Sequence, residues 1–463
     1  MTDDAQQADR QAAGAPDVAD APDAQDASTA SRPRPQAHVI DATDERPHGV
    51  ALARVALALV ACALVAGFVV GIGCLAALRG VDLLQELVWD RLALALPAPI
   101  RPFAPLALCV AGGIAIGLWT KHVGFRLDTL GVIVKRCRAE GGYEFRDMGE
   151  ALVLFALPIA FGGAVGPEAG VSGIVCALAT KAMRALRRQG VAAVSDTSRP
   201  LAAALAELLP AGRGGSASAN GRATALDADV DWRYDRWPRR VLWGFGGLGF
   251  VGGIAFLARM LGPGGGLPRF EPIDYLHGSW LVGILAIACG IVLAGVAGAA
   301  KKAAATALSG MGHVQRATIC GICLGIVAIW LPDVLFSGQK ATGELISSWQ
   351  EKGAVALGAT CVLKLCLTQL CVEGDWVGGE FFPLIYYGVC LGYVLALVTG
   401  ASPMVPVACA CGALVGAATS SPILTTCVLA LCFPPASLPV VALSACVGGK
   451  TLSAIGAKHA RTP

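Results

Sequence analysis

Apolar blocks separated by short polar segments run along most of this 463-residue chain. Several blocks approach the roughly 20 apolar residues that a helix needs to cross a bilayer. The pattern therefore predicts an all-α polytopic membrane protein. The blocks are 51–78, 106–119, 241–261, 280–300, 316–331, 354–372, 381–398, 405–418, 423–433 and 438–457.

Hydrophilic segments set the expected domain boundaries. Residues 1–48 carry almost no large apolar side chains and cannot offset the entropy of ordering, so we expect a disordered cytoplasmic tail. This tail is far longer than the n-region of a signal peptide, so the first apolar block is expected to be retained. The stretch 210–238, rich in Gly and Ser, is typical of a flexible cytoplasmic loop. The remaining expected units are a first membrane repeat at 49–209, a second at 239–457 and a short C-terminal tail at 458–463.

Composition and charge agree with a membrane location. Hydrophobic residues make up 55% of the chain and charged residues 15%, whereas soluble domains carry about 25% charged residues. The formal net charge of +3 is too small to indicate a nucleic-acid partner. Basic residues flank the 210–238 loop, which the positive-inside rule assigns to the cytoplasm. We expect a multi-pass protein of the cell inner (plasma) membrane, in contact with the lipid bilayer, with both termini cytoplasmic. The flanking basic residues are Lys181, Arg184, Arg187, Arg188, Arg233, Arg236, Arg239 and Arg240.

The 17 cysteines do not indicate a metal centre. Most of them lie inside apolar blocks, as Cys62, Cys289 and Cys361 do, and there they are expected to act as small apolar packing residues. No Cys/His cluster has the spacing of a zinc site. We therefore expect no metal and no other cofactor.

A weak internal repeat carries more information than any single block. Gly-Gly-Ala-Val-Gly-Pro at 162–167 opens one predicted helix, and Gly-Gly-Glu-Phe-Phe-Pro at 378–383 opens another. A second Pro-containing string follows each, at 198–200 and at 421–422. Repeated halves broken by Gly and Pro indicate transporter folds whose sites lie where discontinuous helices end near the midplane. Ordinary Gly-mediated helix packing is the alternative.

A helix that begins inside the bilayer favours an anion at its first turn. Its first backbone N–H groups lack intrahelical acceptors, and unsatisfied groups are too costly in hydrocarbon to persist. These groups and the positive end of the helix dipole attract negative charge, and glycines let the backbone approach it. Two such starts predict a weak, neutral site for an anion, which suits conduction because the ion must also leave.

The same two strings resemble motifs of the CLC chloride channel and transporter family. Residues 379–383 fit its GxFxP motif, and residues 163–167 resemble its GxEGP motif with valine at the glutamate position. Further similar segments, which extend the resemblance over most of the chain, are 331–338, 412–422 and 448–450.

This resemblance implies a CLC-like inverted repeat of tilted and discontinuous helices. It also implies a homodimer with a pore in each subunit, and small anions, chloride or similar, as the transported species. The backbone amides of Glu380 and Phe381 are the implied central ligands, and Ser453 stands at the place of the family's pore tyrosine with a hydroxyl that can still donate. The full set expected at the anion site is Gly163, Val165, Gly166, Gly379, Glu380, Phe381 and Ser453.

Departures from the family's motifs affect the expected mechanism. Val165 stands where the family has a gating glutamate that blocks the pore and carries protons, and valine can do neither. At the place of the inner proton-transfer glutamate the chain has Leu209 and Pro210. We therefore expect passive transport of small inorganic anions. The alternative is a secondary anion transporter or exchanger, proton-coupled through non-standard glutamates, with Glu168, Glu207 and Glu380 as candidates.

Two carboxylates near the expected anion site have two interpretations. Glu168 follows Pro167 in the first turn of its helix, and Glu380 lies inside the second string. Each is either an acid that stabilises a helix N-terminus or a replacement gate or proton carrier, since ionisable residues at membrane depth are functional candidates. The sequence leaves both interpretations open.

Two basic residues also have open roles. The family's GSGIP motif has no match at 124–128, so Arg126 is a candidate for the missing inner anion ligand. Lys364 lies inside an apolar block, where it could pair with Glu373 or Asp375, attract anions to a vestibule, or snorkel.

One string favours a different class of protein. Gly-Val-Ser-Gly at 170–173 is similar to the G-x-S-G string of rhomboid serine proteases. Such chemistry needs a histidine base within hydrogen-bond reach of the serine. All six histidines lie in tails or at block edges, so we expect a small-residue helix contact and no enzymatic activity. They are His38, His48, His122, His277, His313 and His459.

Overall fold

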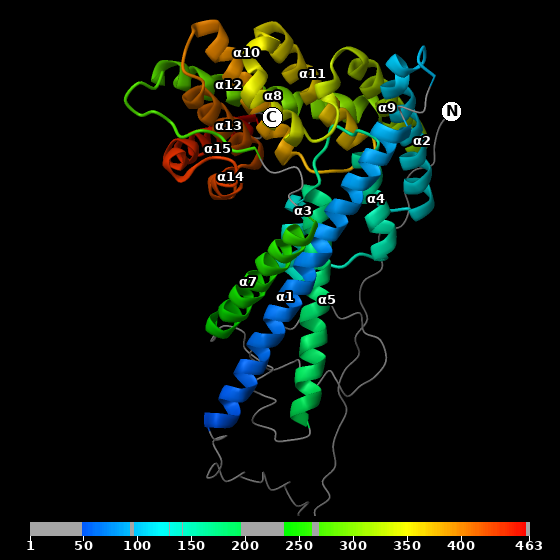
Figure 1. Ribbon diagram of the computed structural model, residues 1–463, viewed down its shortest axis with the longest axis vertical. Coiled ribbons are helices and arrows are strands. Elements are labelled where there is room, and N and C mark those ends of the chain that lie inside the picture. The colour runs from blue at the N-terminus through cyan, green and yellow to red at the C-terminus, as the bar shows by residue number, and fades with distance from the viewer. Residues whose placement is uncertain are drawn as a thin grey trace, which may run out of the picture. The chain divides into compact units, whose positions relative to one another are not determined.

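The computed structural model describes residues 49–92, 97–128, 130–140, 142–195, 236–261 and 268–459. Within these ranges every regular element is a helix and no strand occurs, so the all-α fold class is confirmed (Figure 1). The expected tail at 1–48, nearly all of the expected loop at 210–238, and Glu207, Leu209 and Pro210 lie outside the described residues. The predicted domain boundaries therefore stay predictions.

The helices before residue 196 form a first group. They are α1 (Gly49–Glu86), which continues as a π-helix (Leu87–Leu92), a 3-10 turn (Arg101–Phe103), α2 (Ala104–Val123), α3 (Leu130–Glu140), α4 (Met148–Ala160) and α5 (Glu168–Ser195).

The helices after residue 235 form a second group. They are α7 (Arg236–Leu261), α8 (Trp280–Ala307), α9 (His313–Trp330), α10 (Gln339–Lys352), α11 (Ala354–Glu373), α12 (Phe381–Thr399), α13 (Met404–Thr419), α14 (Pro422–Leu429) and α15 (Leu438–His459). Short 3-10 turns stand at Pro332–Val334 and Pro435–Ser437.

The apolar blocks predicted most of these helices. Seven of the described helices are long and apolar enough to cross a membrane, which supports a multi-pass membrane protein. The blocks did not predict α4 or α10, because α4 has only 13 residues and α10 carries polar side chains along much of its length.

The main hydrophobic core forms around α12. This helix packs against α8, α11 and α13, and its tyrosines Tyr386, Tyr387 and Tyr393 are fully buried. The ring of Tyr393 stacks on Trp349 of α10 with ring centroids 5.0 Å apart. Helix α13 is buried along nearly its whole length and contacts α8, α12 and α15. The helices packed around α12 therefore hold it in place.

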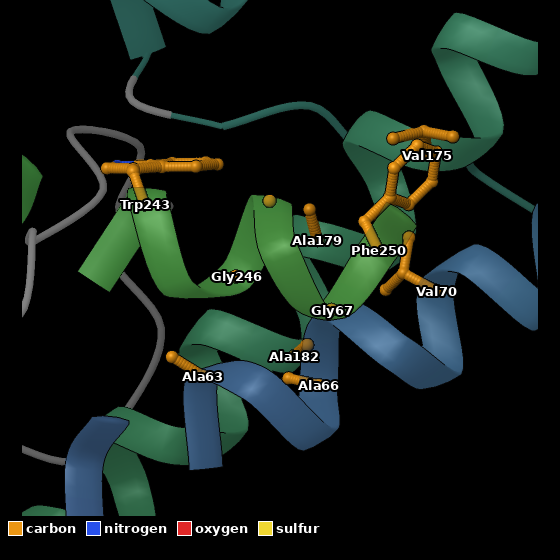
Figure 2. A pocket seen from close by; sticks show the side chains of 11 residues that line it. Ala63, Ala66, Gly67, Val70, Val175, Ala179, Ala182, Trp243, Gly246 and Phe250 are labelled. Carbon is orange, nitrogen blue, oxygen red and sulfur yellow. The ribbon is translucent and has the colours of Figure 1, made fainter. Parts of the chain in front are cut away.

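Helices α1, α5 and α7 pack side by side (Figure 1). Where α1 and α7 cross, Gly67 of α1 lies against the carbonyl of Gly246, and Gly249 of α7 lies against the carbonyl of Leu64. An apolar pocket of about 240 Å³ opens beside this crossing, with Phe250 among its lining residues (Figure 2). The two backbones approach this closely because neither helix carries a side chain at the contact.

We expect Gly249→Ala to loosen this helix pair. An added Cβ would overlap the Leu64 carbonyl, and overpacking of this kind costs about 1–3 kcal/mol. The thermal unfolding midpoint of the purified protein in detergent should fall. Gly244→Ala on the same helix is the matched control, because a Cβ at that position meets nothing within 4 Å. Equal midpoints for the two variants would contradict the close contact.

Candidate functional site

The two broken-helix strings meet in the structure. Gly166 and Gly379 form an isolated antiparallel bridge. The amide of Gly166 donates to the carbonyl of Gly379 at 2.7 Å, and the amide of Gly379 donates to the carbonyl of Gly166 at 2.6 Å. Beside this bridge, the side chain of Val165 lies against Gly378. The segments that open α5 and α12 therefore lie side by side, although more than 200 residues separate them in the sequence.

A carboxylate occupies the amide end of α12. Glu168 is the first residue of α5, and its Oε1 accepts a hydrogen bond of 2.5 Å from the backbone N–H of Phe382. Its Oε2 is buried and has no hydrogen-bond partner among the described residues. The first turn of α12 thus binds a negatively charged oxygen, as the free N–H groups and the helix dipole favour.

Glycines make room for this carboxylate. A Cβ built on Gly166 or on Gly379 would overlap the carboxyl group of Glu168. Any other residue at either position would therefore displace the carboxylate or separate the two strings. One glycine of each string, Gly166 and Gly379, therefore has this steric role.

The predicted anion ligands divide into two groups. The amide of Gly163 donates to the carbonyl of Pro158 at 2.7 Å, and the amides of Gly166 and Gly379 donate to each other's carbonyls. These three N–H groups are occupied by protein acceptors, so they are not the anion donors that the motifs suggested. The N–H groups of Glu380 and Phe381 have no acceptor within the described part of the chain.

The remaining two predicted residues are Val165 and Ser453. The side chain of Val165 is fully buried in an apolar cluster and supplies no polar group. Ser453 belongs to α15, but its side chain lies outside the described residues, so its role stays a prediction.

Glu168 and Glu380 differ in what they contact. Glu380 is the N-cap residue of α12, yet its side chain makes no capping hydrogen bond. Its carboxylate pairs instead with the ammonium of Lys301 on α8 at 3.2 Å, and both side chains are partly exposed. Of the two carboxylates singled out in the sequence, only Glu168 contacts the amide end of α12.

Helices α11 and α12 hold the string at 162–167 through hydrogen bonds that the sequence motifs did not predict. The hydroxyl of Thr368 donates to the carbonyl of Ala164 at 2.7 Å. The hydroxyl of Tyr387 in turn donates to Thr368 Oγ1 at 2.5 Å. All of these groups are buried, so the hydrogen bonds fix the backbone next to Val165. The sequence signal for Thr368 was its spacing, because it falls one helical turn after Lys364 on α11.

Arg126 binds a carboxylate of the protein itself. Asp375, in the turn between α11 and α12, has a fully buried side chain and a left-handed backbone with φ of 70°. Its carboxylate contacts the guanidinium of Arg126, the imidazole of His313 at 2.8 Å and the guanidinium of Arg316 at 2.8 Å. Arg126 also donates to the carbonyl of Glu373 at 3.0 Å. In this structure Arg126 therefore anchors the segment that enters α12.

Two motifs outside this site involve cysteines of α9 and a serine of α5. The string Cys320-Gly-Ile-Cys323 on α9 has Cys-x-x-Cys spacing, but the described residues contain no group of three His, Cys, Asp or Glu side chains that could hold a metal ion. The hydroxyl of Ser172 donates to the carbonyl of Ala169 within its own helix at 2.9 Å.

Comparisons with known proteins identify a matching family model and solved structures of the same fold. Residues 249–454 match the family model described as voltage gated chloride channel. A crystal structure of a CLC-type fluoride/proton antiporter has the same fold, with a TM-score of 0.55 and 17% identity over 88% of this chain and 97% of that chain. A slow cyanobacterial Cl-/H+ antiporter matches with a TM-score of 0.59 and 17% identity over 87% of this chain and 95% of that chain. A search of curated proteins finds no match.

The family match covers the string that opens α12 and does not reach the string that opens α5. Members of this family are channels and transporters and not enzymes, which agrees with the expected absence of protease chemistry. The family match and the shared fold support membership of this chain in the CLC family, as the resemblance of its motifs predicted.

Proposed function

We propose that this protein transports small inorganic anions, chloride or similar, passively across the membrane through a site at the N-terminus of α12. The observation that carries the proposal is the hydrogen bond from the N–H of Phe382 to the carboxylate of Glu168. The two preceding N–H groups, of Glu380 and Phe381, have no acceptor in the described chain. A partly dehydrated anion would satisfy the same donors without a fixed positive charge in contact with it.

The assembly and location of the protein are part of the same proposal. We propose a homodimer in the cell inner membrane, with a pore in each subunit and both termini in the cytoplasm. The seven apolar helices of bilayer length support the membrane location. The solved antiporters with this fold are described as fluoride/proton and Cl-/H+ antiporters, and these descriptions support a small halide as the transported ion.

Glu168 is proposed as the gate of this site. Its carboxylate holds the N–H that a permeating anion would need, so the carboxylate must move away or lose its charge before an anion can bind there. Val165, at the place of the family's gating glutamate, cannot perform this task because its side chain is apolar and buried. The gate therefore comes from the first turn of α5, three residues further along the chain.

Proton-coupled exchange is the second candidate function, and one observation favours it. The Oε2 of Glu168 is buried without a hydrogen-bond partner among the described residues. A carboxyl group in this position can take up a proton when it leaves the amide and release the proton when it returns. Glu168 would then carry a proton for each movement of the gate, and the protein would be an exchanger.

Glu168→Gln should raise anion flux at neutral pH. Hydrogen bonds to a charged acceptor are roughly twice as strong as neutral ones, so a neutral amide side chain would hold the Phe382 N–H less firmly. We expect chloride efflux from liposomes to increase by roughly threefold or more, on the basis of that weaker bond. Glu344→Gln is the matched control, because Glu344 lies on the exposed part of α10, away from the amide end of α12. Unchanged efflux in Glu168→Gln would contradict a gate at this residue.

The flux of the natural protein should also depend on pH. Protonation neutralises the Glu168 carboxylate and releases the amide of Phe382. Efflux should therefore rise as the pH falls from about 7.5 to about 4.5, a range in which carboxyl groups of proteins can titrate. In Glu168→Gln this rise should disappear, since the amide side chain does not titrate. A rise of the same size in both proteins would assign the pH dependence to another group.

Proton movement separates the two candidate functions. In liposomes with a chloride gradient and no pH gradient, a passive pathway should move chloride without moving protons, because no group is obliged to carry one. An exchanger should move protons in the direction opposite to chloride in a fixed ratio and so build up a pH gradient. Proton uptake is measured with a pH electrode or an enclosed pH dye, and uptake that depends on Glu168 would overturn the passive mechanism.

A further inference from the structure

Lys364 of α11 is completely buried in the protein interior. Its ammonium donates to the carbonyl of Asp333 at 2.7 Å and to the carbonyl of Leu335 at 2.7 Å. It also lies 4.9 Å from the centre of the Tyr386 ring. The side chain therefore neither snorkels nor pairs with an acid, which are two of the roles that the sequence left open.

The nearby carboxylates already have other cationic partners. The Asp333 carboxylate pairs with Lys352. The Asp375 carboxylate is surrounded by Arg126, Arg316 and His313. Within the described ranges no carboxylate contacts the Lys364 ammonium. The Lys364 ammonium thus has dipolar partners, two carbonyls and one aromatic face, and no carboxylate in contact with it among the described residues.

A buried charge of this kind is unusual in a membrane protein. Carbonyls and aromatic faces orient negative charge toward an ammonium, but they do not neutralise it. Buried charges are normally paired, and ionisable groups at membrane depth commonly mark the path of an ion. A negative charge at the first turn of α12 would balance Lys364, and either the Glu168 carboxylate or an anion that displaces it could supply that charge.

The position of Lys364 relates it to the anion site at α12. Tyr386, which lies under the ammonium, belongs to the second turn of α12, the helix that begins at Phe381. One turn after Lys364, Thr368 donates to the carbonyl of Ala164 beside Val165. With a rise of about 1.5 Å per residue, five residues of α12 and the ring contact separate the ammonium from the first turn by roughly 10 Å.

We propose that the transported anion, bound at the first turn of α12, is the counter-ion of Lys364. The ammonium attracts the anion through the low-dielectric interior without touching it, so the site gains affinity and keeps the weak contacts that let the ion leave. This inference rests on the proposed anion site and adds the charge that selects anions over cations. Lys364 is thus a specificity-determining residue.

A purely structural role gives a different expectation. By holding the carbonyls of Asp333 and Leu335, Lys364 fixes the turn whose next residue, Phe336, donates its N–H to the carbonyl of Gly162 at 3.1 Å. A side chain that keeps a donor for these carbonyls but lacks the charge would preserve that role. Lys364→Gln keeps a donor without the charge, and Lys364→Arg keeps both.

The test is equilibrium binding of chloride to the purified full-length protein. Isothermal titration in chloride-free buffer should show that Lys364→Gln weakens chloride binding on the order of tenfold, the loss expected for a unit charge about 10 Å away at an effective dielectric constant of about 20. Lys364→Arg should remain close to the natural protein. Lys340→Gln, a matched control on the exposed part of α10, should also bind normally. Normal binding by Lys364→Gln would overturn the proposal.

A second variant removes a negative charge near Lys364 in place of the positive charge of Lys364 itself. Asp333→Asn removes the carboxylate nearest to Lys364 and leaves its backbone carbonyl in place, so chloride binding should become tighter by a few-fold. Its control is Asp333→Asn combined with Lys352→Gln, which also removes the ammonium that the single change leaves unpaired, and the tighter binding should persist in it. Because Asp333 is partly exposed, this variant tests the proposal even if Lys364→Gln does not fold. Unchanged or weaker binding by Asp333→Asn would count against the counter-ion role.

The natural protein separates failure of this inference from failure of the proposed function. If it binds chloride and moves it across liposomes while the Lys364 and Asp333 variants bind with unchanged affinity, only the counter-ion role is wrong. If it neither binds nor moves chloride, fluoride or nitrate, the proposed anion site is wrong and the counter-ion role falls with it.

Discussion

The first turn of α12 presents backbone N–H groups that lack intrahelical acceptors, and the rest of the site is arranged around them. Such groups are costly to leave unsatisfied away from water, and together with the helix dipole they favour a negatively charged acceptor. In the structure the Glu168 carboxylate accepts from Phe382, while the N–H groups of Glu380 and Phe381 have no protein acceptor among the described residues. One part of the helix end is therefore bound by the protein and another part is open to an ion.

The arrangement depends on contacts between distant segments. The bridge between Gly166 and Gly379 brings the start of α5 to the start of α12, and the absence of side chains there leaves space for the Glu168 carboxyl group. Thr368 and Tyr387 fix the backbone on the other side of the first string. A rigid site of this kind suits an anion held by backbone dipoles, since small displacements of the donors would weaken it.

The fixed charges around the site form a consistent pattern. Lys301 pairs with Glu380, and Lys352 pairs with Asp333, so these pairs are neutral. Lys364 is left without a carboxylate, and Asp375 has more than one cationic partner. Positive charge therefore exceeds negative charge around the start of α12, apart from Glu168 itself. This excess is the basis of the proposal that the site selects anions over cations.

The sequence by itself determined the elements and the two broken-helix strings. Apolar blocks of bilayer length follow from the cost of placing polar side chains in lipid, and Gly and Pro at 162–167 and 378–383 interrupt those blocks for local conformational reasons. These local effects were sufficient to predict the fold class and the resemblance to the CLC family. Short or polar helices such as α4 and α10 escaped the same pattern.

Only the tertiary structure decided which groups meet. The amides of Gly166 and Gly379 donate to each other's carbonyls, and the carboxylate at the amide end of α12 is that of Glu168 and not that of Glu380. The tertiary structure also gave Asp375 to Arg126, so that Lys364 is left with carbonyl partners. The physical reason is that hydrogen bonds and charges act over a few ångströms, between residues that can be 200 positions apart, and local sequence patterns do not specify that packing.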